Sequence, residues 1–212
     1  MPLMNRVDPF GALFADRARG LFFGNRGGRF HRDDRTLGLR RWVSRTWICC
    51  RLEFKGRHRD VWGRGYTELF FLDEPTALAA GHRPCFECRR ADARAFATAF
   101  AAGRGEGVIP RAAEIDRILH GERLDGRAKR RHRLPVDGLP DATFLTFADA
   151  PAGVFAVRGR SLLRWTPNGY TTSRARLRGV MAEVLTPPGV LAALSAGYRP
   201  RWHPSADLVP TP

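Results

Sequence analysis

Two cysteines separated by two residues, at the end of a short predicted helix, constrain this chain more than any other feature. The segment runs from Leu78 through a glycine and a proline to Cys85 and Cys88, and arginines follow it. Two thiolates at this spacing can bind one tetrahedral zinc ion, with distant residues completing the coordination shell. The same spacing occurs in thiol–disulfide redox centres, which usually lie beside a parallel βαβ unit. Because the sequence predicts no such unit, we favour a metal site over a redox centre.

The other two cysteines, Cys49 and Cys50, are adjacent in a segment that alternates like a β-strand. The alternation places Cys50 on one face with Ile48, Leu52 and Phe54, and Cys49 on the other face. Because neighbouring strand residues point to opposite faces, both cysteines can bind one ion only across a bulge or at a strand end. Cys49 is therefore either a metal ligand or a small buried thiol.

The predicted fold class is α+β: a three-stranded antiparallel meander with flanking helices and a zinc knuckle, followed by a smaller β-rich C-terminal part. Alternation and turn residues indicate meander strands over residues 47–54, 57–62 and 66–71. Asp73 suits a helix N-cap, Pro75 suits the first turn, and Gly81 ends this short helix. The other expected elements are helices over 91–102, 112–124 and 189–196 and strands over 143–147, 153–157, 162–165 and 180–185.

Changes in composition divide the chain into three parts. Residues 1–40 form a Gly/Arg-rich N-terminal segment, residues 41–125 form the zinc-binding α+β domain, and residues 140–212 form a β-rich C-terminal subdomain with a loose tail. Within the first part, Gly24–His31 combines closely spaced glycines with basic side chains. We interpret it as a solvated turn between two strands, with a phosphate-contacting turn as the alternative.

The composition is that of a globular protein, with 212 residues of which 43% are hydrophobic. No apolar run reaches the length of a membrane span, and the first residues lack the charged head and apolar block of a secretion signal. We therefore expect a cytoplasmic protein that has no membrane partner. A reducing compartment keeps all four cysteines as thiols, which also favours metal binding over disulfides.

The chain is strongly basic, with 36 Lys and Arg against 21 Asp and Glu and a net charge of +15. Guanidinium groups match phosphate geometry, and surplus positive charge speeds the encounter with polyanions. We therefore predict a nucleic-acid partner, with DNA favoured; the alternative is a surface of solvated arginines with no such partner. The residues predicted to contact nucleic acid are Arg51, Arg83, Arg89, Arg90, Lys129, Arg130 and Arg131.

The segment from Phe70 to Arg89 resembles part of a known family. Its aromatic strand end, short helix and Gly81-His-Arg-Pro-Cys-x-x-Cys-Arg motif look like the second half of the zinc-binding N-terminal domain of bacterial Ada methylphosphotriester-repair proteins. The resemblance covers residues 47–90 and implies a three-stranded sheet with flanking helices that holds zinc on cysteines. The whole chain also resembles an uncharacterised family of bacterial proteins of similar length.

Residue by residue, the resemblance matches Cys85 and Cys88 to the second cysteine pair of that family. Cys50, which Arg51 follows, falls at the position of the cysteine that accepts a methyl group from a DNA phosphotriester, so it is the candidate catalytic residue. The remaining family cysteine falls at Phe54, which cannot bind a metal ion. Three ligands are therefore matched, and the fourth is Cys49, a histidine such as His58, or solvent. We predict a zinc site with the ligands Cys50, Cys85, Cys88 and Cys49.

We therefore expect a zinc-containing nucleic-acid-binding protein, with a link to DNA repair or regulation. One alternative is a metal- or cysteine-dependent enzyme that acts on an anionic substrate, because three protein ligands and an open position permit chemistry. A second alternative is a structural zinc knuckle in a protein-interaction module.

Overall fold

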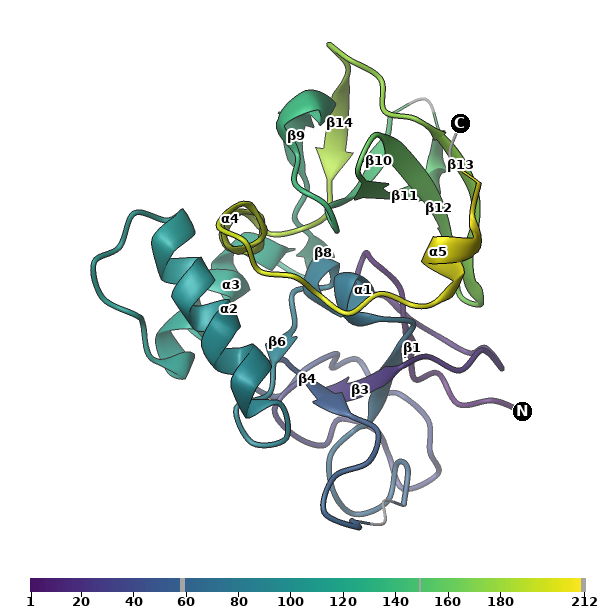
Figure 1. Ribbon diagram of the computed structural model, residues 1–212. Coiled ribbons are helices and arrows are strands. Elements are labelled where there is room, and N and C mark those ends of the chain that lie inside the picture. The colour runs from purple at the N-terminus through teal and green to yellow at the C-terminus, as the bar shows by residue number, and fades with distance from the viewer. Residues whose placement is uncertain (58–59, 149, 211–212) are drawn as a thin grey trace.

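The computed structural model describes residues 1–57, 60–148 and 150–210 and confirms the α+β class. Over these residues the chain forms two six-stranded sheets, a two-stranded ribbon and a set of short and medium helices. Figure 1 shows one sheet below and the other above, with helix α1 (Glu74–Ala79) between them. In the described part of the chain, no helix combines the length and apolar character needed to cross a membrane.

The first sheet has the strand order β2-β1-β5-β3-β4-β6. Its central strand, β3, pairs antiparallel with both β4 and β5, whereas β6 pairs parallel with β4 at the edge. The strands are β1 (Arg6–Val7), β2 (Leu13–Phe14), β3 (Phe22–Asn25), β4 (Ile48–Arg51), β5 (Leu69–Phe71) and β6 (Arg83–Pro84). The predicted N-terminal segment, residues 1–40, thus supplies three strands to the sheet that carries Cys49 and Cys50.

The predicted three-stranded meander is wrong, because β3 lies between β4 and β5 and the described residues of 57–62 form no strand. Strand β3 is buried along its whole length, so it fits the centre of a sheet. Glycine at position 24 allows β3 to lie this close to β4, because a Cβ atom there would lie 1.9 Å from the carbonyl oxygen of Ile48 in β4. The interpretation of Gly24–His31 as a solvated turn therefore missed a strand residue that must be glycine for the two backbones to approach.

The second sheet is antiparallel throughout and has the order β13-β12-β11-β10-β14-β9. Its strands are β9 (His132–Pro135), β10 (Phe144–Phe147), β11 (Ala150–Arg158), β12 (Ser161–Thr166), β13 (Gly169–Ala175) and β14 (Met181–Val184). The four strands predicted for this part are present, and β9 and β13 were not predicted. The segment that leads to the predicted contacts Lys129, Arg130 and Arg131 folds into a ribbon of β7 (Leu124–Asp125) and β8 (Ala128–Lys129).

Helices α2 (Arg90–Gly103), α3 (Ala112–Arg123) and α4 (Pro188–Ser195) lie together on one side of the molecule (Figure 1). Their shared core contains Phe96, Phe100, Leu119, Val190 and Leu194. A single 3₁₀ turn (Val136–Gly138) and the short helix α5 (Ser205–Leu208) complete the elements of the described chain.

Helix α1 is buried and joins the two sheets. Asp73 caps it as predicted, accepting a hydrogen bond from the backbone N–H of Thr76 at 3.0 Å. The carboxylates of Asp73 and Glu74 also accept hydrogen bonds from the hydroxyls of Tyr170 and Tyr198, at 2.8 and 2.5 Å. The start of α1 therefore fastens the C-terminal third of the chain to the segment that leads into the cysteines.

Candidate metal centre

The parallel pairing of β4 with β6 brings the distant cysteines together. Cys50 belongs to β4, Cys85 follows β6 directly, and Cys88 lies two residues before α2. The N–H of Cys85 donates to the carbonyl oxygen of Cys49 at 3.0 Å, which continues the ladder beyond β6. The Cys85–Cys88 turn then closes through the N–H of Arg89, which donates to the carbonyl oxygen of Cys85 at 3.0 Å.

Cys50, Cys85 and Cys88 form a cluster that could hold a metal ion. Their three sulfur atoms lie within 4.8 Å of one another, and all three residues are buried. Thiolates on one tetrahedral zinc ion lie about 3.8 Å apart for Zn–S bonds of about 2.3 Å. Phe23, which stands opposite Cys50 in the β3–β4 ladder, packs against the cluster. The fold therefore provides the part of the predicted site formed by these three residues.

Backbone N–H groups point at the sulfur atoms. The N–H of Glu87 donates to Sγ of Cys85 at 3.4 Å, and the N–H of Arg51 donates to Sγ of Cys88. Hydrogen bonds from the thiols of Cys50 and Cys88, and then from backbone N–H groups, lower the pKa of Cys85, whereas the hydrogen bonds to Cys85 and Cys88 raise the pKa of Cys50. Metal ligation requires thiolates, so a thiophilic ion such as zinc would have to displace the protons that the sulfur atoms share here.

Cys49, a predicted ligand, lies outside this cluster. It is fully buried on the other face of β4, in a separate core with Val7, Leu69 and Phe71. Its Sγ accepts a hydrogen bond from Nη1 of Arg89 at 3.4 Å, and burial raises the pKa of the thiol. The β4 strand has no bulge at this point that would turn both sulfurs the same way, so strand alternation separates them. Cys49 is thus the buried small thiol that the sequence left as an alternative.

A fourth protein ligand is not found among the described residues, because the cysteine cluster includes no further Cys, His, Asp or Glu. His58, which we considered as a fourth ligand, lies outside the described residues. The three cysteines instead line a pocket of about 330 Å³, which we call the cysteine pocket. Asn25, Arg57 and Glu87 add polar groups to its wall, and Arg57 forms an ion pair with Glu87 at 2.8 Å.

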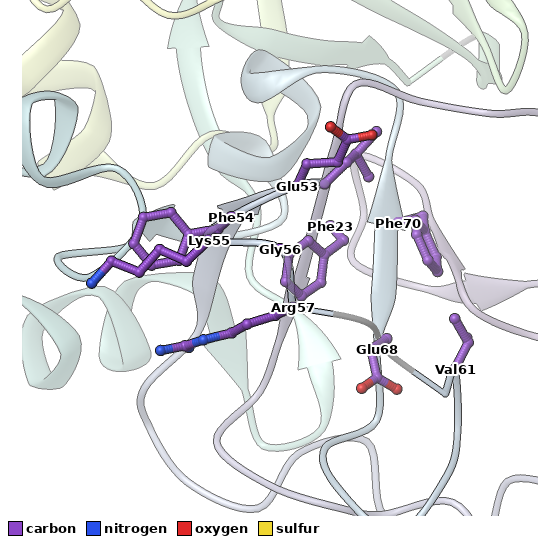
Figure 2. Close-up of a pocket in the computed structure, with 10 residues that line it drawn as sticks. Phe23, Glu53, Phe54, Lys55, Gly56, Arg57, Val61, Glu68 and Phe70 are labelled. Atoms are coloured by element: carbon purple, nitrogen blue, oxygen red, sulfur yellow. The ribbon is translucent and has the colours of Figure 1, made fainter.

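A larger pocket of about 590 Å³ adjoins the cysteine pocket, and we call it the aromatic pocket. The two share Phe23, Phe54 and Arg57 in their walls. Figure 2 shows side chains from β3, from β5 and from the 52–57 loop around this hollow. Most of this wall was not predicted from the sequence. The apolar run Leu21–Phe23 was the available signal for β3, because such runs are typical of buried strands.

Three of the predicted nucleic-acid contacts are engaged inside the protein. Arg83 is buried, and its Nη2 lies 2.8 Å from Oδ2 of Asp116. Arg89 is also buried, and its Nη2 lies 2.7 Å from Oε2 of Glu74. The ammonium group of Lys129 donates to the carbonyl oxygen of Ala79, and burial lowers the pKa of this lysine to about 7. Their guanidinium and ammonium groups are therefore not presented to a phosphate.

The other predicted contacts, Arg51, Arg90, Arg130 and Arg131, are exposed. Arg51 and Arg90 lie close in sequence to Cys50 and Cys88, whereas Arg130 and Arg131 follow the β7–β8 ribbon. The Nη2 atom of Arg130 lies 3.7 Å from Oδ1 of Asp125 in that ribbon. The arginines that remain available to a polyanion therefore include two next to the cysteine cluster.

A scan against models of protein families, a search of curated proteins and a search of solved structures each returned no match. The resemblance to the Ada domain therefore stays a prediction.

Proposed function

We propose that Cys50, Cys85 and Cys88 bind one zinc ion and that the fourth coordination position faces the cysteine pocket. The observation that carries this proposal is that three sulfur atoms from two remote parts of the chain lie within 4.8 Å of one another and line that pocket. Thiolate ligands select soft or borderline ions such as zinc, and hydrogen-bond donors around the sulfurs support the ligands. Zinc would also fasten the Cys85–Cys88 turn to the first sheet.

The test is the metal content of protein purified without chelators. We expect about one zinc per chain, as for a single tetrahedral site. Cys85→Ser and Cys88→Ser should lose most of the metal, whereas Cys49→Ser, the matched control from the other face of β4, should keep it. Absence of metal from the wild type, or equal loss in Cys49→Ser, would contradict the proposal.

We further propose nucleic acid, with DNA favoured, as the partner of the surface around this centre, in a protein that serves DNA repair or regulation. The net charge of +15 and the exposed positions of Arg51 and Arg90 beside the cysteines support this proposal. Phosphate contacts make affinity fall steeply as salt rises. We expect Arg51→Ala/Arg90→Ala to weaken duplex binding and to reduce its salt dependence. The control pair, Arg111→Ala at the N-cap of α3 and Arg117→Ala on its exposed side, should change both much less.

The open coordination position favours a second function, a metal- or cysteine-dependent enzyme acting on an anionic substrate. Three protein ligands with one free position are typical of catalytic zinc sites. The resemblance to the Ada domain implies one such reaction, in which Sγ of Cys50 would attack the methyl carbon of a methylphosphotriester, the methyl C–O bond would break and the phosphodiester anion would leave. Mass spectrometry of zinc-loaded protein after incubation with methylphosphotriester DNA would show a methyl group on Cys50, and an unmodified Cys50 would exclude this reaction.

A further inference from the structure

The aromatic pocket is separate from the cysteines and has a wall suited to a flat ring. None of the three clustered cysteines lines it. Phe23, Phe54 and Phe70 contribute three aromatic rings, and Leu52 and Val61 add apolar surface (Figure 2). Pockets of this size, mostly apolar with a few oriented polar groups, are typical small-molecule sites. The aromatic rings favour a planar ligand that can stack on them.

Glu68 provides the oriented acceptor in this pocket. It is only 7% exposed, and its Oε2 accepts a hydrogen bond from the backbone N–H of Trp62 at 2.9 Å. The indole N–H of Trp62 donates to the carbonyl oxygen of Glu68 at 3.0 Å. Oε1 has no hydrogen-bond partner among the described residues, so it is available to a ligand N–H. A carboxylate held in this way selects hydrogen-bond donors.

The backbone at Trp62 indicates that this contact is enforced. Trp62 adopts a φ of 59°, a left-handed conformation that a bulky residue rarely takes. Strained residues of this kind persist where surrounding contacts hold them, and they cluster at functional sites. Here the two hydrogen bonds to Glu68 hold Trp62, so the strained residue also fixes the carboxylate in the pocket.

Two cations lie at the same pocket. Lys55 Nζ is 5.3 Å from the centre of the Phe54 ring, and the guanidinium carbon of Arg57 is 5.6 Å from it. Arg57 is already paired with Glu87, with Nη2 2.8 Å from Oε1, whereas Lys55 forms no ion pair with any acidic side chain in the described part of the chain. A ligand that stacks an aromatic ring on Phe54 and places a negative group near Lys55 would match both the aromatic ring and the cation.

We propose that the aromatic pocket binds a nucleotide: the base stacks on the rings of Phe54 and Phe70, its N–H groups donate to Glu68, and its phosphate lies near Lys55. Guanine fits this acceptor better than adenine, because its N1–H and N2–H donors lie side by side on one edge. The inference deepens the proposed nucleic-acid function. It rests on that function only where the bound base belongs to a nucleic-acid strand. A free nucleotide carries the same chemistry.

Isothermal titration calorimetry of the full-length protein with GMP, AMP and 1-methyl-GMP tests this assignment. GMP should bind at least about tenfold more tightly than either analogue, because each leaves the buried carboxylate with fewer donors. The comparison with 1-methyl-GMP uses the wild-type protein and does not depend on any variant folding. Equal affinity for the three ligands, or no binding at millimolar GMP, would overturn the proposal.

The Glu68→Gln variant tests the acceptor directly. Its amide oxygen can still accept the N–H of Trp62, whereas its NH₂ group faces the ligand with donors, so GMP affinity should fall about tenfold or more. Glu114→Gln, which removes the same charge from an exposed residue outside the pocket, is the control and should leave affinity within about twofold. An equal loss in both variants would assign the effect to charge alone and overturn the role of Glu68.

The source of the base is distinguished by a second set of titrations. An oligothymidylate with one central guanine should bind more tightly than GMP if the pocket receives a base from a strand, and no better than oligothymidylate if it receives a free nucleotide. Zinc content measured on the same samples separates this inference from the metal proposal. Zinc without GMP binding overturns the inference alone. GMP binding that Glu68→Gln weakens, in protein without zinc, overturns the metal proposal alone.

Discussion

The buried ion pair between Arg83 and Asp116 makes the sharpest stability prediction. Two hydrogen bonds, Nε to Oδ1 at 2.9 Å and Nη2 to Oδ2 at 2.8 Å, join the two side chains, which are 5% and 4% exposed. Asp116→Asn leaves the Arg83 charge buried without its counterion. Removing one partner of a buried pair costs about 3–5 kcal/mol, a large part of the stability of a single domain. We expect a loss of this size in the free energy of unfolding.

Urea denaturation followed by fluorescence measures this loss. Glu114→Gln, an exposed acid on the same helix, is the control and should stay within about 0.5 kcal/mol of the wild type. The double variant Arg83→Met/Asp116→Leu should recover most of the stability, because a buried ion pair replaced by apolar groups is often neutral or stabilising. It should also keep the duplex binding that we propose for the wild type. A loss below about 1 kcal/mol in Asp116→Asn would refute the argument, since it would mean that water screens the pair.

Two further predictions concern the β3 strand and Lys129, which is half-buried. Gly24→Ala should destabilise the protein by about 1–3 kcal/mol or more in thermal unfolding and reduce its zinc content, because the added Cβ overlaps the carbonyl oxygen of Ile48. In the control Gly121→Ala the added Cβ would meet no atom within 4 Å. This control should be neutral or slightly stabilising in the same assay. Burial lowers the pKa of Lys129 to about 7, whereas in the unfolded chain it is about 10.4. The unfolded state therefore binds more protons between these values. The free energy of unfolding of the wild type, minus that of Lys129→Met, should therefore rise from pH 7 to pH 10. A difference between these two free energies that stays constant over this range in urea denaturation would contradict the prediction.

The local signals in the sequence predicted those parts of the fold that neighbouring residues determine. The capped helix at Asp73, the helices α2 to α4 and four strands of the second sheet follow from periodicity, caps and turns. The order of the first sheet does not, because β3 is joined to β4 and β5 only through long-range pairing. A strand of four residues that contains a glycine carries too little local pattern to compete with the turn signals around it.

The candidate site was predictable in its sulfur chemistry and not in its surroundings. The spacing of Cys85 and Cys88, and the strand alternation that separates Cys49 from Cys50, can both be read from the sequence. The pockets cannot, because Phe23, Arg57 and Glu68 come from three segments whose packing depends on the position of β3. Sequence reasoning identified the possible ligands and left open which groups surround them.

Net charge misled the choice of nucleic-acid contacts because it counts buried and exposed cations alike. Beyond Arg83 and Arg89, the guanidinium groups of Arg26 and Arg123 are buried on Trp47, with ring-centre distances of 4.0 and 3.8 Å. Their donors are directed to backbone carbonyl oxygens of Gly11, Gly81 and Arg45. Arg26 and Arg123 each satisfy two backbone carbonyl groups in this way. All four buried arginines add to the charge total without adding to the surface field. The basic composition is therefore partly structural, and a phosphate-binding role has to be assigned residue by residue from exposure.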